Sequence, residues 1–471
     1  MSDLKYVGKG ISREDGIDKV SGAARYTHDL VVPGMLHTAV IKSPQASARI
    51  VRIRTEAAEA LPGVRVVLTG EGLCYRLGLY MQDKCILARE FVRYQGEAVV
   101  AVAADTLDIA RAACRLIEIE YEPIDAVLDP QDAMAEGAHL VHPDLGLYEH
   151  MRGVFFPRAG TNIAHHQKIR KGDFDAAFEA SDVKLTASFY NPPVQHVPME
   201  THATIAQVLP GNRVELWTSS QSPFTVRHLM SVAFGMPHAN IRVHVPFVGG
   251  GFGGKAGLGL EPLAHVLSRA AGGRPVKVVA TREEEFNTLP SRQGLHSTIE
   301  VGCTQSGKIE ALKSTYTWDA GAYADYGVNI GRAAAYAGAG PYAIDNCWID
   351  SYVVYTNKIF GTAYRGFGHL EILWGIERAI DMMARKLEMD PAAFRRLNLL
   401  EEGDTTITGE SFTSGHGSPV GCLDAAADAI DWEAERRAFG AGQGSWQGDR
   451  HAPQGARHAD LHVMRRRDQT R

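Results

Sequence analysis

Apolar residues in the first 130 positions indicate a strand, a helix and a second strand in close succession. The run AVVAVAA at 98–104 has the length and composition of a buried strand. Apolar residues at positions 107, 110, 114 and 117 follow with helical spacing. The segment EIEYEPI at 118–124 then has the composition of another strand. These patterns predict a βαβ unit within a small α/β domain over residues 1–130.

Strand and helix patterns also alternate between residues 161 and 440. A helix is predicted to begin after Ser222 as its N-cap, with Pro223 in the first turn, and to end at Gly235. A longer helix is predicted over about 370–388, where apolar residues recur at helical spacing. The chain as a whole is therefore expected to fold in the mixed α/β class.

Two stretches lack such periodicity. Residues 131–160 are rich in turn-forming residues, and we expect them to link the two regions. Residues 441–471 contain six arginines against three aspartates and few regularly spaced apolar residues. This composition is typical of a disordered basic tail, and it is also what an out-of-frame translation would give.

Composition narrows the functional classes. The chain has 471 residues, of which 45% are hydrophobic and 22% are charged, as expected for a globular protein of two or three domains. A net charge of -6 gives no basis for nucleic-acid binding. No apolar run reaches membrane length, and the N-terminus lacks a basic segment followed by an apolar one. We therefore expect a cytoplasmic protein without a membrane segment.

Six cysteines are scattered along the chain, and none forms a C-x-x-C pair. They are Cys74, Cys85, Cys114, Cys303, Cys347 and Cys422. Irregular spacing of this kind predicts no zinc site and no iron–sulfur cluster on this chain. Most such cysteines are expected to be small buried hydrophobic residues.

The segment VGGGFGGKAG at 248–257 is the most distinctive local signal. Its glycines satisfy G-x-G-x-x-G, and its first part satisfies a Walker pattern as far as Lys255. Ala256 follows where a Walker loop needs a hydroxyl for magnesium, and the loop lies in mid-chain rather than in the first βαβ unit. Nucleotide binding is therefore disfavoured. Two readings stay open, a backbone cradle close to a ligand and a tight turn without one.

Several further segments, in the same order along the chain, resemble the molybdenum-binding large subunits of the xanthine dehydrogenase and aldehyde oxidase family. They are DGIDKVSGAARYTHDL at 15–30, PVQHVPMETHAT at 193–204, TSSQSPFTVR at 218–227, the glycine loop itself, and GTAYRGFGHLE at 361–371. The resemblance extends over about residues 5–435. It implies an a/b hammerhead domain over 1–130 followed by the first part of a molybdopterin-binding domain over 161–440.

The resemblance also implies a cofactor and a set of site residues. The cofactor would be molybdenum held by molybdopterin, in its mononucleotide or cytosine dinucleotide form. The residues expected to contact it are Gln221, Gly250, Gly251, Phe252, Gly253 and Arg365. Tyr364 and Phe367 are expected to line the substrate pocket, and Arg332 is the candidate for a catalytic arginine. Glu200 and His202, two residues apart, are too few for a metal site and are interpreted as structural or as part of the pocket rim.

Two positions depart from particular branches of the family. Ala256 stands where xanthine-oxidising members have a glutamate, and Gly366 stands where carbon monoxide dehydrogenases have a cysteine. The resemblance therefore favours hydroxylation of an aldehyde or an N-heteroaromatic substrate, with oxygen taken from water. Electrons would pass to an iron–sulfur subunit and on to an FAD subunit, since neither cofactor is expected on this chain.

Family large subunits continue well beyond this length, and the glutamate that serves them as general base has no counterpart here. A second molybdopterin subunit could carry that half. Alternatively, the gene is frameshifted near codon 440 and the product is truncated and inactive, or the chain binds a cofactor or partner without catalysis. The truncated product is slightly favoured because of the unusual tail. An isolated chain is then expected to associate and to lack molybdenum.

Overall fold

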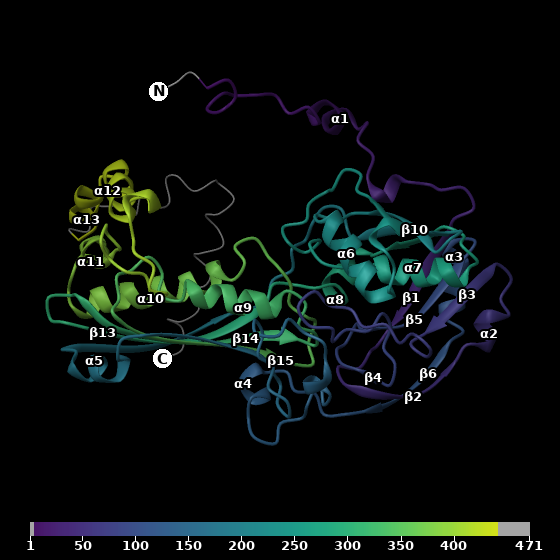
Figure 1. The fold of residues 1–471 in the computed structure, drawn as a ribbon, viewed down its shortest axis with the longest axis horizontal. Coiled ribbons are helices and arrows are strands. Elements are labelled where there is room, and N and C mark those ends of the chain that lie inside the picture. The colour runs from purple at the N-terminus through teal and green to yellow at the C-terminus, as the bar shows by residue number, and fades with distance from the viewer. Residues whose placement is uncertain (1–3, 441–471) are drawn as a thin grey trace.

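The computed structural model describes residues 4–440, and the tail at 441–471, for which disorder or a frameshift was predicted, lies outside them (Figure 1). Three sheets organise the described chain. The seven-stranded sheet has the order β11-β10-β9-β12-β1-β5-β3, the five-stranded sheet β7-β15-β14-β13-β8, and the three-stranded sheet β4-β2-β6. Among residues 4–440, no helix is both long and apolar enough to cross a lipid bilayer.

The strands are short except in the five-stranded sheet. Those of the seven-stranded sheet are β1 (Leu36–Lys42), β3 (Val64–Thr69), β5 (Ala98–Ala104), β9 (Ala203–Leu209), β10 (Arg213–Thr218), β11 (Ile241–His244) and β12 (Val276–Val279). Those of the five-stranded sheet are β7 (Ile163–Lys171), β8 (Val183–Asn191), β13 (Gly294–Cys303), β14 (Ile309–Gly321) and β15 (Asn346–Tyr355). The small sheet contains β2 (Ala48–Arg54), β4 (Phe91–Val92) and β6 (Glu118–Pro123).

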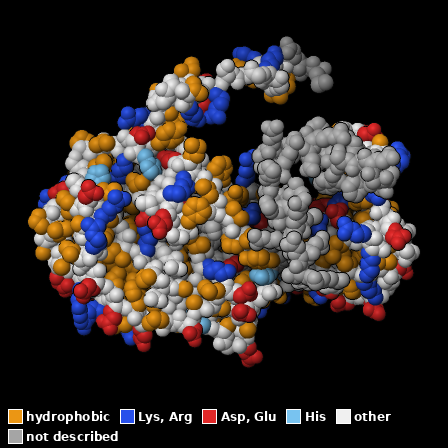
Figure 2. Space-filling view, turned by 180° about the vertical axis from the view of Figure 1, so that it is seen from behind, with side chains coloured by type: hydrophobic (Ala, Val, Ile, Leu, Met, Phe, Trp, Pro, Cys, Tyr) orange, Lys and Arg blue, Asp and Glu red, His pale blue; other side chains and the backbone are white. Residues whose placement is uncertain are grey.

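Helices cover both larger sheets (Figure 1). They are α1 (Gly16–Ser21), α2 (Glu56–Glu59), α3 (Leu107–Cys114), α4 (Pro130–Ala133), α5 (Phe174–Ala180), α6 (Pro223–Phe234), α7 (Glu261–Ala270), α8 (Arg282–Asn287), α9 (Gly327–Tyr336), α10 (His369–Lys386), α11 (Pro391–Asn398), α12 (Pro419–Ala429) and α13 (Trp432–Gly440). Helices α9 and α10 lie along one side of the five-stranded sheet and α5 lies on the other (Figure 1). The segment that carries α1 extends from the body as an arm (Figure 1; Figure 2).

The two predicted long helices form as expected. Helix α6 begins at Pro223 and ends before Gly235, whose φ of 62° is the left-handed conformation that glycine adopts most easily. Ser222 occupies the N-cap position, but its side chain makes no capping hydrogen bond. The proline in the first turn is therefore the local signal that marks the start of this helix. Helix α10 occupies most of the stretch 370–388, and its apolar face is buried against the five-stranded sheet.

The predicted βαβ unit is wrong as a topology, although its elements exist. Strand β5 lies between β1 and β3 and runs antiparallel to both, whereas β6 pairs with β2 in the small sheet. The burial of the strands explains the difference. Nearly every residue of β5 is buried, while β6 is mostly exposed and suits a small surface sheet.

The two predicted regions share one sheet and are not separate bodies. Strand β1 pairs in parallel with β12, through Leu36 opposite Val276, so the first 130 residues extend a sheet that begins in the second region. The turn-rich stretch 131–160 is also more than a connector, because Leu145 and Phe155 are buried in the main core. A shared sheet does not mark where one domain ends and the next begins, so the domain boundaries at 130, 160 and 440 stay predictions.

Asn398 fastens helix α11 to the turn that precedes β14. It is fully buried, and its Nδ2 donates to the carbonyl oxygens of Gly307 and Phe394 at 2.9 Å each. Its Oδ1 accepts from the backbone N–H of Ile309 at 2.8 Å. One side chain thus satisfies three buried backbone groups.

We predict that Asn398→Leu lowers the free energy of unfolding by about 3 kcal/mol, because three buried backbone groups lose their partner. Denaturant unfolding followed by circular dichroism measures this loss. The matched control is Asn240→Leu, because the Asn240 side chain donates hydrogen bonds only to exposed carbonyl oxygens. This variant should change the free energy of unfolding by less than about 0.5 kcal/mol. Equal losses in both variants would contradict this account of Asn398.

Candidate functional site

The glycine loop at 248–257, which connects β11 to α7, meets two segments that are far from it in sequence. Gln221, just before α6, accepts through Oε1 a hydrogen bond from the backbone N–H of Gly253 at 2.9 Å. The carbonyl of Phe252 accepts from the backbone N–H of Arg365 at 2.8 Å. The loop is therefore held between the Gln221 side chain and the segment 363–368, which precedes α10.

Two glycines of the loop leave room for these contacts, Gly251 for the Gln221 side chain and Gly253 for a backbone carbonyl. A Cβ on Gly251 would lie 2.4 Å from Oε1 of Gln221. A Cβ on Gly253 would lie 2.4 Å from the carbonyl oxygen of Ala363, and Gly253 also has a φ of 108°. Real Cβ atoms do not approach so closely, so the junction of the three segments depends on these glycines.

Both joined segments place a phenylalanine in left-handed backbone between two glycines. Phe252 has a φ of 55° and Phe367 a φ of 50°. Such a conformation costs a bulky residue about 1–3 kcal/mol and persists only where its surroundings enforce it. The ring of Phe252 is 45% exposed, whereas Phe367 is half-buried and meets Tyr326 edge to face at 6.3 Å. Two strained aromatic residues at one junction are typical of a functional site.

The lysine of the loop points into the protein. Lys255 is buried, and its Nζ donates to the carbonyl oxygen and to Oε2 of Glu200, at 2.8 Å and 3.0 Å. The same Oε2 accepts from the backbone N–H of Gly249 at 2.8 Å. Burial lowers the pKa of Lys255, and the neighbouring Glu200 opposes that shift. A lysine occupied in this way is not free for a phosphate, which agrees with the rejection of the Walker reading.

His202 supports the loop from the same side. Both of its ring nitrogens face oxygen atoms, Oε1 of Glu285 at 2.8 Å and the carbonyl oxygen of Gly254 at 3.1 Å. Burial alone would raise the pKa of Glu285, but the hydrogen bonds and charge of His202 lower it. Glu200 and His202 therefore have the structural role that the sequence indicated for them.

Sequence reasoning missed two residues beside Tyr364. His196 donates through Nε2 to the carbonyl oxygen of Ala363 at 2.7 Å, and its ring lies 4.6 Å from that of Tyr364. Burial lowers the pKa of His196. The guanidinium of Arg292 lies over the ring of Tyr364, 5.4 Å from its centroid, and forms an ion pair with Glu371 at 3.2 Å. His196 lies within the recognised stretch PVQHVPMETHAT, whereas nothing in the sequence marks Arg292.

Arg332 does not join this group in the described structure. It lies on α9, with its guanidinium over the ring of Tyr336 at 5.1 Å. Burial, with help from the charges of His166 and Arg332, lowers the pKa of His165 to about 4. Within residues 4–440, no hydrogen bond, ion pair or cation–π contact joins Arg332 to Gln221, to the loop or to 363–368. Its catalytic role stays a prediction.

The junction presents donors and no carboxylate to a ligand. Because Gly253 occupies Oε1 of Gln221, the amide nitrogen of this exposed side chain is left to donate. Within the described chain, the backbone N–H groups of Gly250, Gly251 and Phe252 have no acceptor, and the guanidinium of Arg365 has no ion pair. Consecutive backbone donors with a neutral amide suit a ligand that carries oxygen acceptors. Residues 4–440 contain no cluster of three or more side chains suited to hold a metal ion.

Free donors around a glycine loop in an α/β fold are typical of a binding site for a ligand with oxygen acceptors, and comparison with known proteins identifies the class. Residues 155–399 match the Molybdopterin cofactor-binding domain. Residues 21–125 match the aldehyde oxidase and xanthine dehydrogenase a/b hammerhead domain. The chain belongs to the xanthine dehydrogenase and aldehyde oxidase family, as a member with a hammerhead domain and a molybdopterin-binding domain. This confirms the predicted family and fold class.

Individual relatives differ in what they act on. The nicotinate dehydrogenase large molybdopterin subunit of Eubacterium barkeri is 30% identical, over 87% of this chain and 92% of its own length. The xanthine dehydrogenase molybdenum-binding subunit of Escherichia coli O157:H7 is 31% identical, over 90% of this chain and 56% of its own. The crystal structure of quinoline 2-oxidoreductase from Pseudomonas putida 86 is 30% identical, with a TM-score of 0.82, over 91% of this chain and 55% of that one. The chain spans about half the length of most curated relatives that it matches.

We predict that Gly253→Ala lowers the free energy of unfolding by more than about 3 kcal/mol, because it combines left-handed strain with a clash against a backbone carbonyl. Thermal and denaturant unfolding would measure the loss. The control is Gly211→Ala in the β9–β10 turn, where φ is 77° and no atom lies within 4 Å of the added Cβ. That variant should cost only about 1–2 kcal/mol of left-handed strain. If Gly253→Ala cost no more than the control, the loop would not be clamped as described.

Proposed function

We propose that this chain is part of a molybdenum hydroxylase that oxidises an aldehyde or N-heteroaromatic substrate with oxygen from water. The observation that carries the proposal is the junction of Gln221, the glycine loop and the segment 363–368, which the hydrogen bonds to Gly253 and Arg365 hold together. It lies within the part of the chain that matches the molybdopterin-binding domain.

The residues present fit the cofactor. The amide nitrogen of Gln221 and the backbone N–H groups of 250–252 are neutral donors for its oxygen acceptors, and none of them titrates near neutral pH. Arg365 supplies a permanent positive charge for an anionic part of the cofactor. When bound, the molybdenum centre supplies two-electron oxidation chemistry. The pterin is in the mononucleotide or the cytosine dinucleotide form under this proposal.

The chain's own residues shape the substrate side. Phe367 and Tyr364 come from the same clamped segment, so fixing Arg365 against the loop also fixes both rings. Phe367 offers a half-buried aromatic face, backed by Tyr326. Ala256 and Gly366 offer neither a carboxylate nor a thiol. This lining favours a flat, apolar substrate and gives no acceptor for a purine.

The proposal includes partners. This sequence has no match to the family's general base, and we propose that residues outside it complete the site, either further along the same polypeptide or in a second molybdopterin-binding subunit. Electrons then leave through an iron–sulfur subunit and an FAD subunit. A cytoplasmic location belongs to the same proposal.

The test is to produce this chain with its partner chains in a host that makes molybdopterin. We expect about one molybdenum per chain by elemental analysis, and a hydroxylated product that carries 18O from labelled water. Oxidation without molybdenum, or product oxygen derived from dioxygen, would refute the proposed function.

We further predict that Gln221→Ala lowers kcat by at least about tenfold while molybdenum content is kept, because one positioned donor is lost from a preorganised site. Gln305→Ala, in the exposed turn between β13 and β14, is the matched control and should leave kcat unchanged. A variant at Gln221 with full activity would remove this residue from the site.

A further inference from the structure

A hairpin from the hammerhead region inserts beside the proposed substrate pocket. The segment 77–84, called here the 77–84 hairpin, is closed by the paired backbones of Leu77 and Lys84, with Leu77 N donating to Lys84 O at 2.8 Å. Gly78 permits the tight turn, since a Cβ there would lie 1.7 Å from the carbonyl oxygen of Met81. The ring of Tyr80 at its tip meets Tyr326 edge to face at 5.5 Å.

Carboxylates of the first 130 residues hold the segment 323–326, which leads into α9. Asp83, within the hairpin, accepts through Oδ2 from the backbone N–H of Ala324 at 2.6 Å. Glu97 accepts from the hydroxyl of Tyr323. Both carboxylates are almost completely buried. The position of segment 323–326 is therefore set by residues outside the molybdopterin-binding domain.

Asp325 connects this segment to the clamped segment 363–368. Its Oδ1 accepts from the backbone N–H of Tyr326 at 2.7 Å and from the hydroxyl of Thr362 at 2.6 Å. Asp325 has a φ of 37°, a strained left-handed conformation that the two hydrogen bonds help to enforce. Tyr326, the next residue, donates weakly from its hydroxyl to the carbonyl of Ala256 at 3.4 Å and packs on Phe367.

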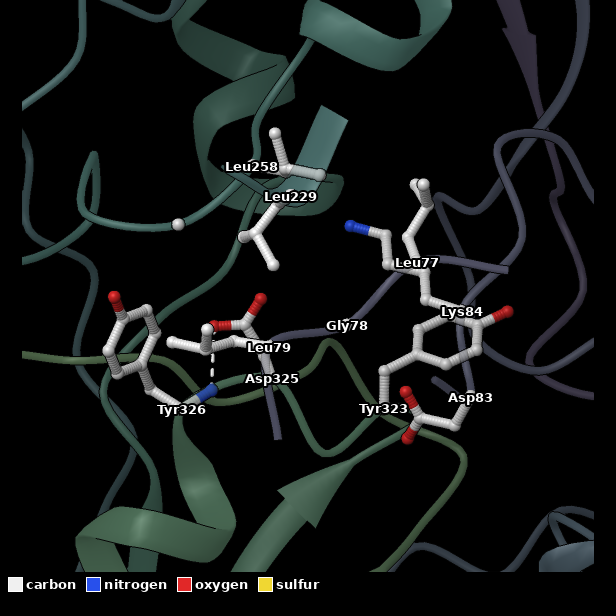
Figure 3. Close-up of a pocket in the computed structure, with 11 residues that line it drawn as sticks. Leu77, Gly78, Leu79, Asp83, Lys84, Leu229, Leu258, Tyr323, Asp325 and Tyr326 are labelled. Carbon is white, nitrogen blue, oxygen red and sulfur yellow. Dashed lines mark hydrogen bonds between the residues drawn. The ribbon is translucent and has the colours of Figure 1, made fainter. Parts of the chain in front are cut away.

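Lys84 supplies the positive charge of this buried group. Figure 3 shows its side chain directed into a small cavity, with Asp325 across from it and Leu229 and Leu258 along the wall. Its ammonium lies 4.0 Å from the ring centroid of Phe360, and no carboxylate of the described chain is within ion-pairing distance. Burial lowers the pKa of Lys84 and raises that of Asp325, and each charge opposes the shift of the other.

We propose that Lys84 is a positioning residue, whose ammonium faces Asp325 across this cavity and stabilises the carboxylate that fixes Tyr326 against Phe367. A residue of the hammerhead region thereby sets one wall of the substrate pocket. The placement of Tyr326 rests on the geometry alone, and the description of that wall as part of a substrate pocket rests on the proposed function. Lys84 supplies the positive charge that faces the half-buried Asp325 across the cavity, so loss of the ammonium should loosen the segment that Asp325 holds.

Three variants test the pairing in the full assembly. Lys84→Met removes the ammonium and keeps the length of the side chain. Asp325→Asn keeps the acceptor oxygen for Tyr326 and Thr362 but removes the charge. The double variant removes both the ammonium and the Asp325 charge, although Asp83 and Glu97 still lose the ammonium, and it should recover the part of the Lys84→Met effect that passes through Asp325. Lys313→Met is the control, because it breaks an ion pair with Glu300 on the five-stranded sheet, at 3.3 Å.

The first readout needs no catalysis. Hydrogen exchange followed by mass spectrometry should show amides of 323–328 and 361–367 exchanging about tenfold faster in Lys84→Met, with strands β13 and β14 unchanged. The double variant should return to within about threefold of the wild type. No change in Lys84→Met, acceleration spread over all strands, or a double variant no better than Lys84→Met would each overturn the proposal. If Lys84→Met fails to fold, the double variant must fold for the proposal to stand.

The second readout separates positioning from the proposed function. In the molybdenum-loaded complex, KM should rise about tenfold in Lys84→Met with kcat within about twofold, and Lys84→Arg should restore KM in part. An unchanged KM would overturn the role of Lys84 at the pocket. A wild-type complex that loads molybdenum but hydroxylates nothing would instead refute the proposed function, and the exchange data would still decide whether Lys84 positions Tyr326.

Discussion

The backbone contact between the glycine loop and the segment 363–368 is the constraint on which the site depends. Phe252 O and Arg365 N bond at 2.8 Å, and this close approach needs Gly253, whose Cβ would lie 2.4 Å from the carbonyl oxygen of Ala363. Side chains at those two positions would push Gln221 away on one side and Ala363 on the other. One junction thereby makes both a donor-rich surface and an aromatic surface.

Buried charge supports the junction from two directions. Lys255 and Glu200 hold the loop against the stretch METH, and His202 and Glu285 hold it against α8. Buried pairs of this kind add little net stability, because desolvation offsets most of their attraction, but they tolerate only one arrangement. We infer that these pairs serve to fix the loop conformation more than to stabilise the fold.

The hammerhead region and the molybdopterin-binding region depend on each other. They share the seven-stranded sheet through β1 and β12, and the 77–84 hairpin braces the start of α9. Asp83 bonds the backbone of Ala324 across this boundary. Because buried polar groups at the boundary are satisfied only by partners on the other side, neither region can be expected to keep its conformation alone.

The sequence by itself determined the local features. Proline and glycine mark the bounds of α6, helical spacing marks α10, and the segments around Gln221, the glycine loop and Arg365 mark the family. Each of these depends on neighbouring residues or on a specific string, so no tertiary information was needed. The glycines in particular indicate a backbone that approaches other groups closely, and this holds wherever the loop lies in the fold.

Only the tertiary structure decided the long-range arrangement. Strands β5 and β6 are each recognisable as strands from sequence, but their pairing with β1 and β3 in one case and with β2 in the other comes from distant segments. The burial of Leu145 and Phe155, the inward direction of Lys255 and the contacts of His196, Arg292 and Lys84 are equally non-local. The sequence does not show whether a charged residue faces water or a buried partner, because the partner that makes its burial possible comes from a distant segment.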